Sequence, residues 1–324
     1  MKCLITGGAG FIGSHLSEAL LKKGHSVAII DNLSTGRLEN IEHLKDNENF
    51  TYHIDSIMNK TLMTELVEKC DIVYHLAAAV GVKYIIDHPL ESILTNVGGT
   101  EIVLSLAHEY GNKKVLIAST SEVYGKDRPG KRIFHEEDDR VLGPTSIVRW
   151  SYSCTKAIDE FLSIAYFKEK NLPVVIVRFF NTCGEKQTGR YGMVVPRFVK
   201  QAIAGESITI YGDGKQTRCF TDVSDSVRAV IMLSEEPNAV GETFNIGNPD
   251  NKVTINALAN KIKKMTGSKS TVRHISYEKA YEKGFEDMRH REPDISKLRK
   301  FVDFSPEVTI DEMLAKVIKD IKRK

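Results

Sequence analysis

The sequence is poor in the features that mark secreted, membrane-spanning and metal-binding proteins. Its 324 residues include one tryptophan and five cysteines, and the cysteines are widely spaced with no CxxC pair. This pattern argues against a disulfide framework and against a zinc site. No apolar run approaches the roughly 18–20 residues that cross a bilayer, and the N-terminus leads into a glycine loop instead of a cleavage site. We therefore expect a cytoplasmic protein with reduced thiols and no metal.

Charge of one sign is also lacking. The 45 Lys and Arg residues nearly balance the 43 Asp and Glu residues, which leaves a formal net charge of +2. A nucleic-acid-binding surface would need a local basic patch, and the sequence offers only the short run Lys322, Arg323, Lys324. We therefore expect no nucleic acid and no membrane among the partners.

The first 180 residues alternate short apolar runs with helical patterns. Expected strands cover residues 2–6, 26–31, 72–76, 114–119 and 173–178, and expected helices cover residues 11–23, 62–69, 97–110 and 154–170. Such alternation is typical of a parallel sheet with crossover helices. It predicts an α/β fold with a doubly wound (Rossmann) sheet.

After residue 181 the sequence becomes richer in glycine, proline and charge. A helix over residues 197–204 and a strand over 208–211 indicate a smaller, discontinuous α/β substrate domain, formed by residues 181–221 and 248–324. Residues 222–234 are expected to form a helix and residues 242–247 a strand that returns to the main sheet. The dinucleotide-binding domain is thus predicted to comprise residues 1–180 and about 222–247.

The segment GGAGFIG follows the first expected strand and opens the first expected helix. Gly7 permits a tight turn, Gly10 lets a ligand approach the backbone, and Gly13 lets the helix pack on the strand. Phe11 and Ile12 begin the helix, whose N-terminus would stabilise a pyrophosphate. In this context the loop predicts a dinucleotide site.

The second expected strand ends in Asp31-Asn32. An acidic side chain at this place accepts hydrogen bonds from an adenosine ribose and repels a 2′-phosphate. The sequence therefore predicts NAD as the cofactor and not NADP.

The GxxGxxG spacing resembles that of the extended short-chain dehydrogenase/reductase family. Asp55, the segment His75-Leu76-Ala77-Ala78, and Asn96 match further positions of that family. By this resemblance Asp55 lies on the adenine side, Leu76, Ala77 and Ala78 line NAD, and Asn96 is a structural asparagine.

The reacting group is predicted at Tyr152 and Lys156, which lie four residues apart on one helix face. A phenol has a reference pKa near 10, and a neighbouring ammonium ion stabilises the phenolate. Tyr152 is therefore the expected base at a sugar hydroxyl, with Lys156 as its electrostatic partner and ribose anchor. Thr120 or Ser121, at the end of the strand before it, is the expected second hydroxyl contact.

The second domain resembles that of the nucleotide-sugar epimerases, dehydratases and decarboxylases of the same family. Arg218 follows the turn YGDGKQT and is expected to clamp a diphosphate. By the resemblance, Asn181, Val195, Tyr211 and Gln216 complete the UDP-sugar site.

The motif STSEVYG separates the members of this group. The 4,6-dehydratases carry an Asp-Glu pair where this chain has Ser121-Glu122, so the acid for water elimination is missing. The motif is similar to that of UDP-glucuronate decarboxylases, as are the segments around residues 142–152, 214–222, 283–285 and 290–294. By that resemblance Glu122 and Arg291 are catalytic, and the product is UDP-xylose or a UDP-4-keto-pentose.

Two alternatives stay open. The segment 189–198 is equally typical of the 4-epimerases, which share every predicted residue except the reason for Glu122 and Arg291. A non-catalytic NAD-binding sensor is disfavoured by the intact Tyr152 and Lys156. The resemblance also implies a homodimer formed by the helices that follow Asn96 and Tyr152.

Overall fold

The computed structural model describes residues 1–126, 130, 133–189, 193–280 and 288–323. Its main element is a seven-stranded sheet with the strand order β12-β7-β5-β4-β1-β2-β3, and all neighbours in it are parallel. The strands are β1 (Lys2–Thr6), β2 (Ser26–Ile30), β3 (Phe50–His53), β4 (Ile72–His75), β5 (Lys114–Thr120), β7 (Val174–Phe179) and β12 (Thr243–Ile246). The predicted doubly wound parallel sheet is confirmed.

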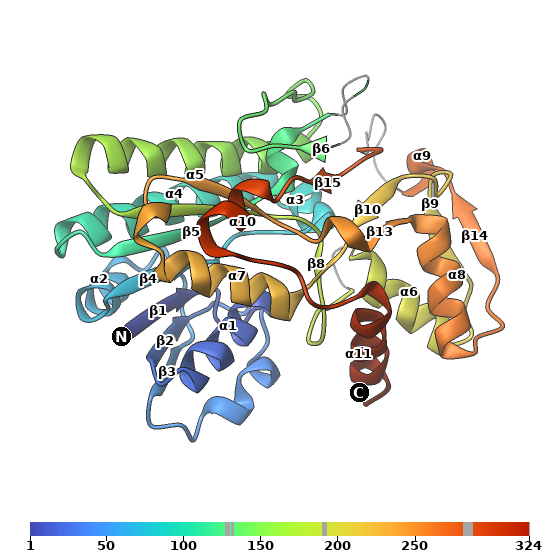
Figure 1. Ribbon diagram of the computed structural model, residues 1–324, viewed down its shortest axis with the longest axis horizontal. Coiled ribbons are helices and arrows are strands. Elements are labelled where there is room, and N and C mark those ends of the chain that lie inside the picture. Colours follow the sequence, from blue (N-terminus) through green and yellow to red (C-terminus); the bar gives the residue numbers. More distant parts are fainter. Residues whose placement is uncertain (127–129, 131–132, 190–192, 281–287, 324) are drawn as a thin grey trace.

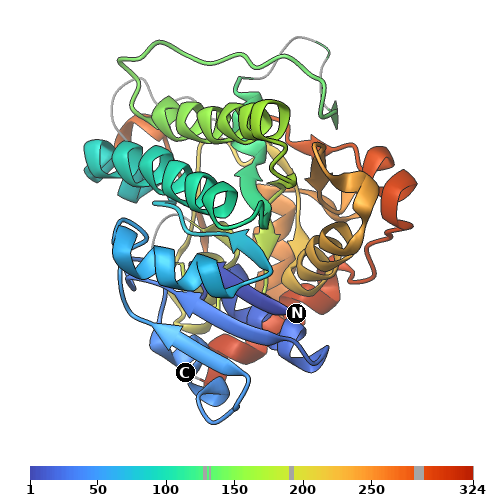
Figure 2. The ribbon, with the colours of Figure 1, turned by 90° about the vertical axis from the view of Figure 1, so that its left-hand side faces the viewer.

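Helices cover both faces of this sheet (Figures 1 and 2). Alternate residues of β1 point to opposite faces: Cys3 and Ile5 belong to one buried apolar cluster and Leu4 to another. The helices of the first cluster are α1 (Phe11–Lys22), α7 (Val223–Glu235) and α10 (Ser296–Val302), and those of the second are α2 (Lys60–Lys69), α4 (Pro89–Glu109) and α5 (Arg149–Lys170). Both faces of every central strand are therefore buried.

Several elements differ from the sequence prediction, among them α5, which begins at Arg149 and not at residue 154. Strand β3 was not expected, because Phe50 is its one buried side chain and the apolar signal of an edge strand is therefore weak. Helix α4 begins at Pro89, earlier than predicted, with proline in the first turn where its missing N–H costs no hydrogen bond. The predicted return of the chain to the sheet is confirmed, since β12 pairs with β7.

A second lobe lies beside the carboxyl ends of these strands (Figure 1). Its apolar core is formed by α6 (Val194–Ile203), α8 (Ile255–Thr266), α11 (Ile310–Arg323) and β9 (Ile208–Tyr211), which pairs in parallel with β14 (Val272–Ile275). Ile295, Leu298 and Phe304 instead lie in the core of the large sheet, although the predicted division assigned them to the substrate domain. The domain boundaries as a whole stay a prediction.

The remaining elements are short. They are α3 (Val82–Asp87), α9 (Tyr277–Ala280), β6 (Ile133–Phe134), β8 (Thr182–Cys183), β10 (Thr217–Cys219), β11 (Thr221–Asp222), β13 (Lys252–Thr254), β15 (Glu292–Pro293) and the 3₁₀ turns η1 (Leu38–Asn40), η2 (Glu42–Leu44), η3 (Ser121–Tyr124), η4 (Pro237–Ala239) and η5 (Pro249–Asn251). None of the helices that the structure describes is both long and apolar enough to cross a bilayer.

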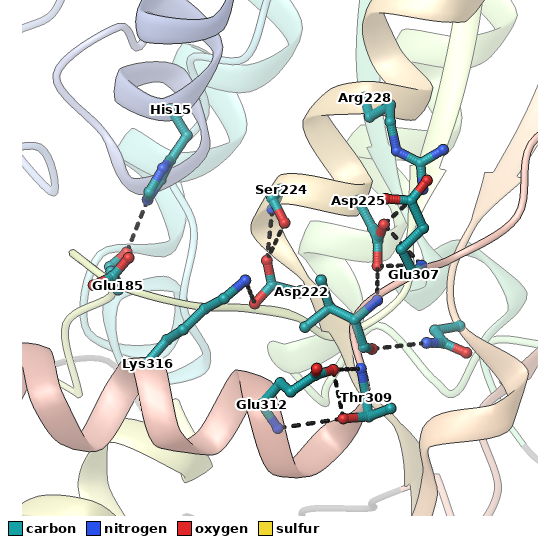
Figure 3. A network of polar contacts seen from close by, with 12 residues as sticks. His15, Glu185, Asp222, Ser224, Asp225, Arg228, Glu307, Thr309, Glu312 and Lys316 are labelled. Carbon is teal, nitrogen blue, oxygen red and sulfur yellow. Dashed lines mark hydrogen bonds and ion pairs between the residues drawn. The ribbon is translucent and has the colours of Figure 1, made fainter.

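The N-terminus of α7 joins the C-terminal helix to the rest of the molecule (Figure 3). Asp222 caps α7 by accepting a hydrogen bond from the Ser224 amide at 2.9 Å, and its other oxygen lies 3.3 Å from Lys316 Nζ on α11. Buried Asp225 accepts hydrogen bonds from the amides of Glu307 and Val308 at 3.0–3.1 Å. Asp222 and Asp225 thus hold α11 and the segment before it against α7, which covers one face of the main sheet.

Candidate active site

A cleft of about 530 Å³ opens at the carboxyl ends of the parallel strands, where the strand order reverses between β1 and β4. This is the usual ligand site of an open α/β sheet. The predicted residues that line it are Gly7, Gly10, Phe11, Ile12, Gly13, Asp31, Asn32, Asp55, Leu76, Ala77, Ala78, Thr120, Ser121, Glu122, Tyr152, Lys156, Asn181, Val195, Tyr211, Gln216, Arg218 and Arg291. Asn96 is the one predicted site residue that does not line the cleft.

The glycine loop is packed too tightly against backbone atoms to accept side chains at Gly7 and Gly13. Gly7 has a φ of +73°, and a Cβ on it would lie 2.9 Å from the amide nitrogen of Ala77. A Cβ on Gly13 would lie 2.2 Å from the carbonyl oxygen of Gly7. The loop therefore passes close to the β4 turn and delivers the open N-terminus of α1 to the cleft. These residues fit a dinucleotide whose pyrophosphate lies against backbone N–H groups.

Two carboxylates lie at the next strand ends. Asp31 accepts hydrogen bonds from the amides of Ala9 and Leu33 at 3.0 and 2.8 Å. Burial raises the pKa of Asp31, and these backbone donors counteract part of the shift. Asp55 accepts hydrogen bonds from the Ser56 amide at 2.6 Å and from Asn59 at 2.7 Å. Both carboxylates are thus held in place on the side of the cleft predicted to bind adenosine.

Asn96 supports the cleft from behind. Its Oδ1 accepts a hydrogen bond of 2.7 Å from the Ala79 amide, and its Nδ2 donates to the hydroxyl of Thr155 on α5. The side chain is buried and ties the turn after β4 to the helix that carries Tyr152 and Lys156. This placement agrees with a structural asparagine.

Helix α5 presents Tyr152 and Lys156 to the cleft beside the end of β5. Lys156 Nζ lies 3.1 Å from Oδ2 of Asp159, one turn further along the helix. The pKa of Tyr152 is raised by burial and by the negative charges of Glu122 and Asp159. The prediction from the sequence considered Lys156 alone and so expected the pKa of Tyr152 to fall. The two anions around the pair oppose that effect.

Glu122 lies between two arginines. Its Oε1 accepts a hydrogen bond of 2.6 Å from Arg291 Nη2, and its Oε2 accepts one of 3.2 Å from Arg149 Nη2. Burial acts to raise the pKa of Glu122, but the charges of Arg291 and Arg149 outweigh it and lower the pKa to about 2. The group is therefore an anion at neutral pH, and the cluster carries one net positive charge.

The other wall of the cleft comes from the second lobe. Gln216 Nε2 donates hydrogen bonds of 3.1 Å to the Tyr211 carbonyl and to the Tyr277 hydroxyl. The Arg197 guanidinium lies over the Tyr211 ring at 4.1 Å, and Arg218 is 8% exposed. Two guanidinium groups at this wall suit a diphosphate.

Arg149, Arg197 and Tyr277 are among the cleft residues that were not predicted from the sequence as site residues. Arg149 carries a usable signal, because it precedes Tyr152 by three residues and so shares its helix face. Arg197 and Tyr277 meet the cleft only through the packing of the second lobe. Residues 190–192 and 283–285, which belong to segments compared with the 4-epimerases and the decarboxylases, lie outside the described residues.

Known proteins match nearly the whole chain. A UDP-N-acetyl-alpha-D-glucosaminuronate decarboxylase from Bacillus cytotoxicus is 46% identical over 318 residues, which cover 98% of this chain and 96% of the relative. UDP-glucuronic acid decarboxylase 1 from Danio rerio is 35% identical, with 99% and 73% covered.

Among solved structures, the UDP-glucuronic acid 4-epimerase from Bacillus cereus, in complex with UDP-glucuronic acid and NAD, is 30% identical with a TM-score of 0.89. The match covers 100% of this chain and 99% of that one. The family model described as GDP-mannose 4,6 dehydratase matches residues 4–317. The strand-end cleft, the glycine loop and these matches agree, and the chain belongs to the GDP-mannose 4,6-dehydratase family within the extended short-chain dehydrogenases/reductases.

Proposed function

We propose that the protein is an NAD-dependent decarboxylase of a UDP-hexuronate, either UDP-glucuronate or its 2-acetamido analogue. The observation that carries this proposal is the cluster of Glu122 with Arg149 and Arg291 beside Tyr152. A buried site with one net positive charge suits a substrate with a carboxylate on its sugar. The similarity to two UDP-uronate decarboxylases supports the same reaction.

The reaction begins at carbon 4 of the sugar. When bound, NAD supplies a hydride acceptor and, at the end, a hydride donor. Tyr152 takes the proton of the 4-hydroxyl, with Lys156 beside it, and Thr120 or Ser121 holds the oxygen. Oxidation places a ketone β to the carboxylate carbon. The bond from carbon 5 to that carbon then breaks, and its electron pair moves toward the carbonyl oxygen, where Tyr152 and the hydroxyl donors stabilise the enolate.

Arginines that are paired with Glu122 suit the loss of carbon dioxide better than unpaired arginines would. Arg291 and Arg149 can orient the sugar carboxylate, but Glu122 offsets part of their charge. A site that bound the carboxylate too strongly would stabilise the ground state and slow the loss of carbon dioxide. Glu122 therefore has an electrostatic role in this proposal, and the proton that carbon 5 gains as the enolate collapses comes from solvent water.

Dehydration is disfavoured despite the name of the family model. Ser121 stands where the 4,6-dehydratases carry an aspartate, and the lowered pKa of Glu122, about 2, leaves it without a proton to give at neutral pH. A 4-epimerase is the second candidate, because the solved UDP-glucuronic acid 4-epimerase shares the fold over the whole chain.

The deciding experiment incubates the protein and NAD with UDP-glucuronate, with its 2-acetamido analogue and with UDP-glucose, and analyses the products by mass spectrometry. Loss of the mass of carbon dioxide from a uronate supports the decarboxylase. An unchanged mass with inversion at carbon 4, detected by NMR, would establish the epimerase instead. No conversion of any of the three would refute both.

A homodimer is proposed on the outer faces of α4 and α5. Leu90 and Leu94 on α4 are 69% and 58% exposed, and Phe161 on α5 is 68% exposed. Exposed large apolar side chains on adjacent helices are typical of a protein interface. Light scattering of the wild type and of Phe161→Asp tests this, and a monomeric wild type would contradict it. The five free cysteines suit the cytoplasm, the proposed location.

A further inference from the structure

Asp159 is a buried carboxylate that the reaction described above does not use. It lies on α5 one turn after Lys156, with its side chain 0% exposed, and its Oδ2 lies 3.1 Å from Lys156 Nζ, whose side chain is 3% exposed. Tyr152, Lys156 and Asp159 occupy positions i, i+4 and i+7 and so share one face of the helix. Burying an anion is costly unless a partner compensates it, so its placement against Lys156 calls for a reason.

Asp159 is also linked to the cofactor side of the cleft. Thr100 of α4 faces its carboxylate, and the Thr100 hydroxyl lies 3.2 Å from Nε2 of His75 at the end of β4. Nδ1 of His75 lies 2.8 Å from the hydroxyl of Thr6, which accepts a hydrogen bond from the Ala77 amide. Burial and the charge of Lys156 lower the pKa of His75 to about 3, so this link is neutral. Asp159 is therefore the acidic end of a buried polar chain behind the cleft; burial raises its pKa, and Lys156 and Thr100 offset part of that shift.

Charged and titratable groups face Tyr152 and Asp159 from several parts of the chain. They are Arg149, Lys156 and Glu160 on α5, Glu122 on η3 together with Arg291, and the neutral His75 at the end of β4. Glu122 is ion-paired with Arg149 and Arg291. Asp159 is the second anion that raises the pKa of Tyr152, and the ammonium of Lys156 is its ion-pair partner.

We propose that Asp159 is a positioning residue, which holds the Lys156 ammonium in place and sets the pH range in which Tyr152 exchanges its proton. The proposal rests on the proposed function for the identity of the reaction, but its tests do not require decarboxylation. With Asp159 ionised, the positive charge of Lys156 is partly cancelled and Tyr152 stays a phenol to higher pH. A phenol is the form that returns a proton to the oxygen on carbon 4 when the hydride comes back.

The test replaces Asp159 with asparagine, which keeps the size and a hydrogen-bond acceptor for Lys156 but removes the charge. The rate of hydride transfer is followed by the absorbance of reduced nicotinamide in a single turnover, from mildly acidic to alkaline pH. The acidic limb of the profile should move to lower pH by about one unit or more, because a like charge near Tyr152 is gone. The control is Ser163→Ala, a buried position on the same helix whose hydroxyl donates a hydrogen bond to the Asp159 backbone carbonyl and not to its side chain.

A second readout needs no turnover. The ultraviolet absorbance of phenolate is titrated in each protein and in its Tyr152→Phe counterpart, and the difference isolates Tyr152. In Asp159→Asn the phenolate of Tyr152 should begin to form at lower pH than in the wild type.

An unchanged acidic limb and an unchanged phenolate titration would overturn the proposal. Failure of both Asp159→Asn and Asp159→Ser to fold would overturn it too, because Asp159 would then be required for folding itself. If a UDP-sugar is oxidised without loss of carbon dioxide, the decarboxylase proposal fails. The pH dependence of hydride transfer then still tests the role of Asp159. If no UDP-sugar reduces NAD, the proposed function fails and the phenolate titration decides on Asp159 alone.

Discussion

The two halves of the cleft are held together by different forces. In the cofactor half, the glycine loop and Asp31 are fixed by backbone hydrogen bonds, such as that from the Ala9 amide to Asp31 at 3.0 Å. In the sugar half, Glu122 is fixed by ion pairs with Arg149 and Arg291. Backbone amides do not titrate, whereas both members of an ion pair must keep their charge. Substitutions should therefore change cofactor retention in one half and chemistry in the other, and acid should affect the two halves differently.

The largest effect is expected at Tyr152, where the halves meet. Tyr152→Phe removes the group proposed to exchange the proton at carbon 4, and general acid–base catalysis of this kind contributes about 10²–10⁴-fold. Turnover should fall by that factor while binding of the UDP-sugar, measured by calorimetry, stays nearly unchanged. The control is Tyr166→Phe on the same helix but outside the cleft. Activity within tenfold of the wild type would assign the base to another residue.

The next largest effect separates the sugar half from the cofactor half. Arg291→Met and Glu122→Gln should slow the release of carbon dioxide by about 10²-fold, the loss typical for one electrostatic contact in a reaction centre. UDP affinity should change much less, because Arg218 and Gln216 lie elsewhere on the wall. Arg299→Met, at an exposed position on α10, serves as the control. If both variants instead lose UDP binding in proportion to activity, the cluster holds the nucleotide and not the uronate.

A fall in pH should change the contributions of the two halves to folding stability in opposite directions. The folded-state pKa of Glu122 is about 2, below the ordinary 4.5, so its pairing stabilises the fold above about pH 4.5 and that stability is lost as the pH falls toward 2. At one unit per 1.36 kcal/mol the loss is about 3 kcal/mol at most. Burial raises the pKa of Asp31 above its ordinary 3.8, so protonation in acid removes the free-energy cost of burying its charge.

Urea unfolding at a series of acidic pH values checks this difference. Glu122→Gln should flatten the loss of stability between pH 4.5 and 2, whereas Asp31→Asn should remove the gain in stability that the wild type shows as the pH falls toward 3.8, the ordinary pKa of Asp31. If the free energy of unfolding depends on pH with the same slope in both variants and in the wild type, electrostatics does not distinguish the two halves.

The smallest effect is expected for the cofactor half alone. A Cβ at position 13 would lie 2.2 Å from the Gly7 carbonyl, so Gly13→Ala must displace the loop. Overpacking of this kind costs about 1–3 kcal/mol. If the loop relaxes in the free protein and must take up the strain again to bind NAD, the affinity for NAD falls roughly tenfold or more. Gly24→Asn is the control, since Gly24 is left-handed with no atom within 4 Å of an added Cβ. NAD content after purification measures the result, and wild-type occupancy would contradict it.

The part of the site that the sequence alone could predict consists of local patterns. The loop from Gly7 to Gly13, the end of β2 at Asp31 and the pair Tyr152 and Lys156 are local patterns, each contained in one strand end or one helix turn. Glu122 and Arg291 were predicted through resemblance to a family, and no spacing in the chain joins them.

The missed residues show the physical reason for this limit. Arg149 matters because Glu122 lies beside it, and Asp159 because it is buried against Lys156, so neither role is visible before the helix is packed. Strand β3 was missed because Phe50 alone is buried in it. Periodicity reports which side chains face a core, but it does not report which charged groups face each other across it.

The contact between Arg291 and Glu122 joins residues 169 positions apart, and this separation has a consequence for folding. Closing so long a loop costs entropy that only the later packing of the second lobe repays. During refolding the glycine loop and the first strands can form early from neighbouring segments, whereas the reaction centre is complete only when the chain has nearly finished. Recovery of NAD binding should therefore precede recovery of turnover, and the delay between the two would time the final docking of the C-terminal part onto the sheet.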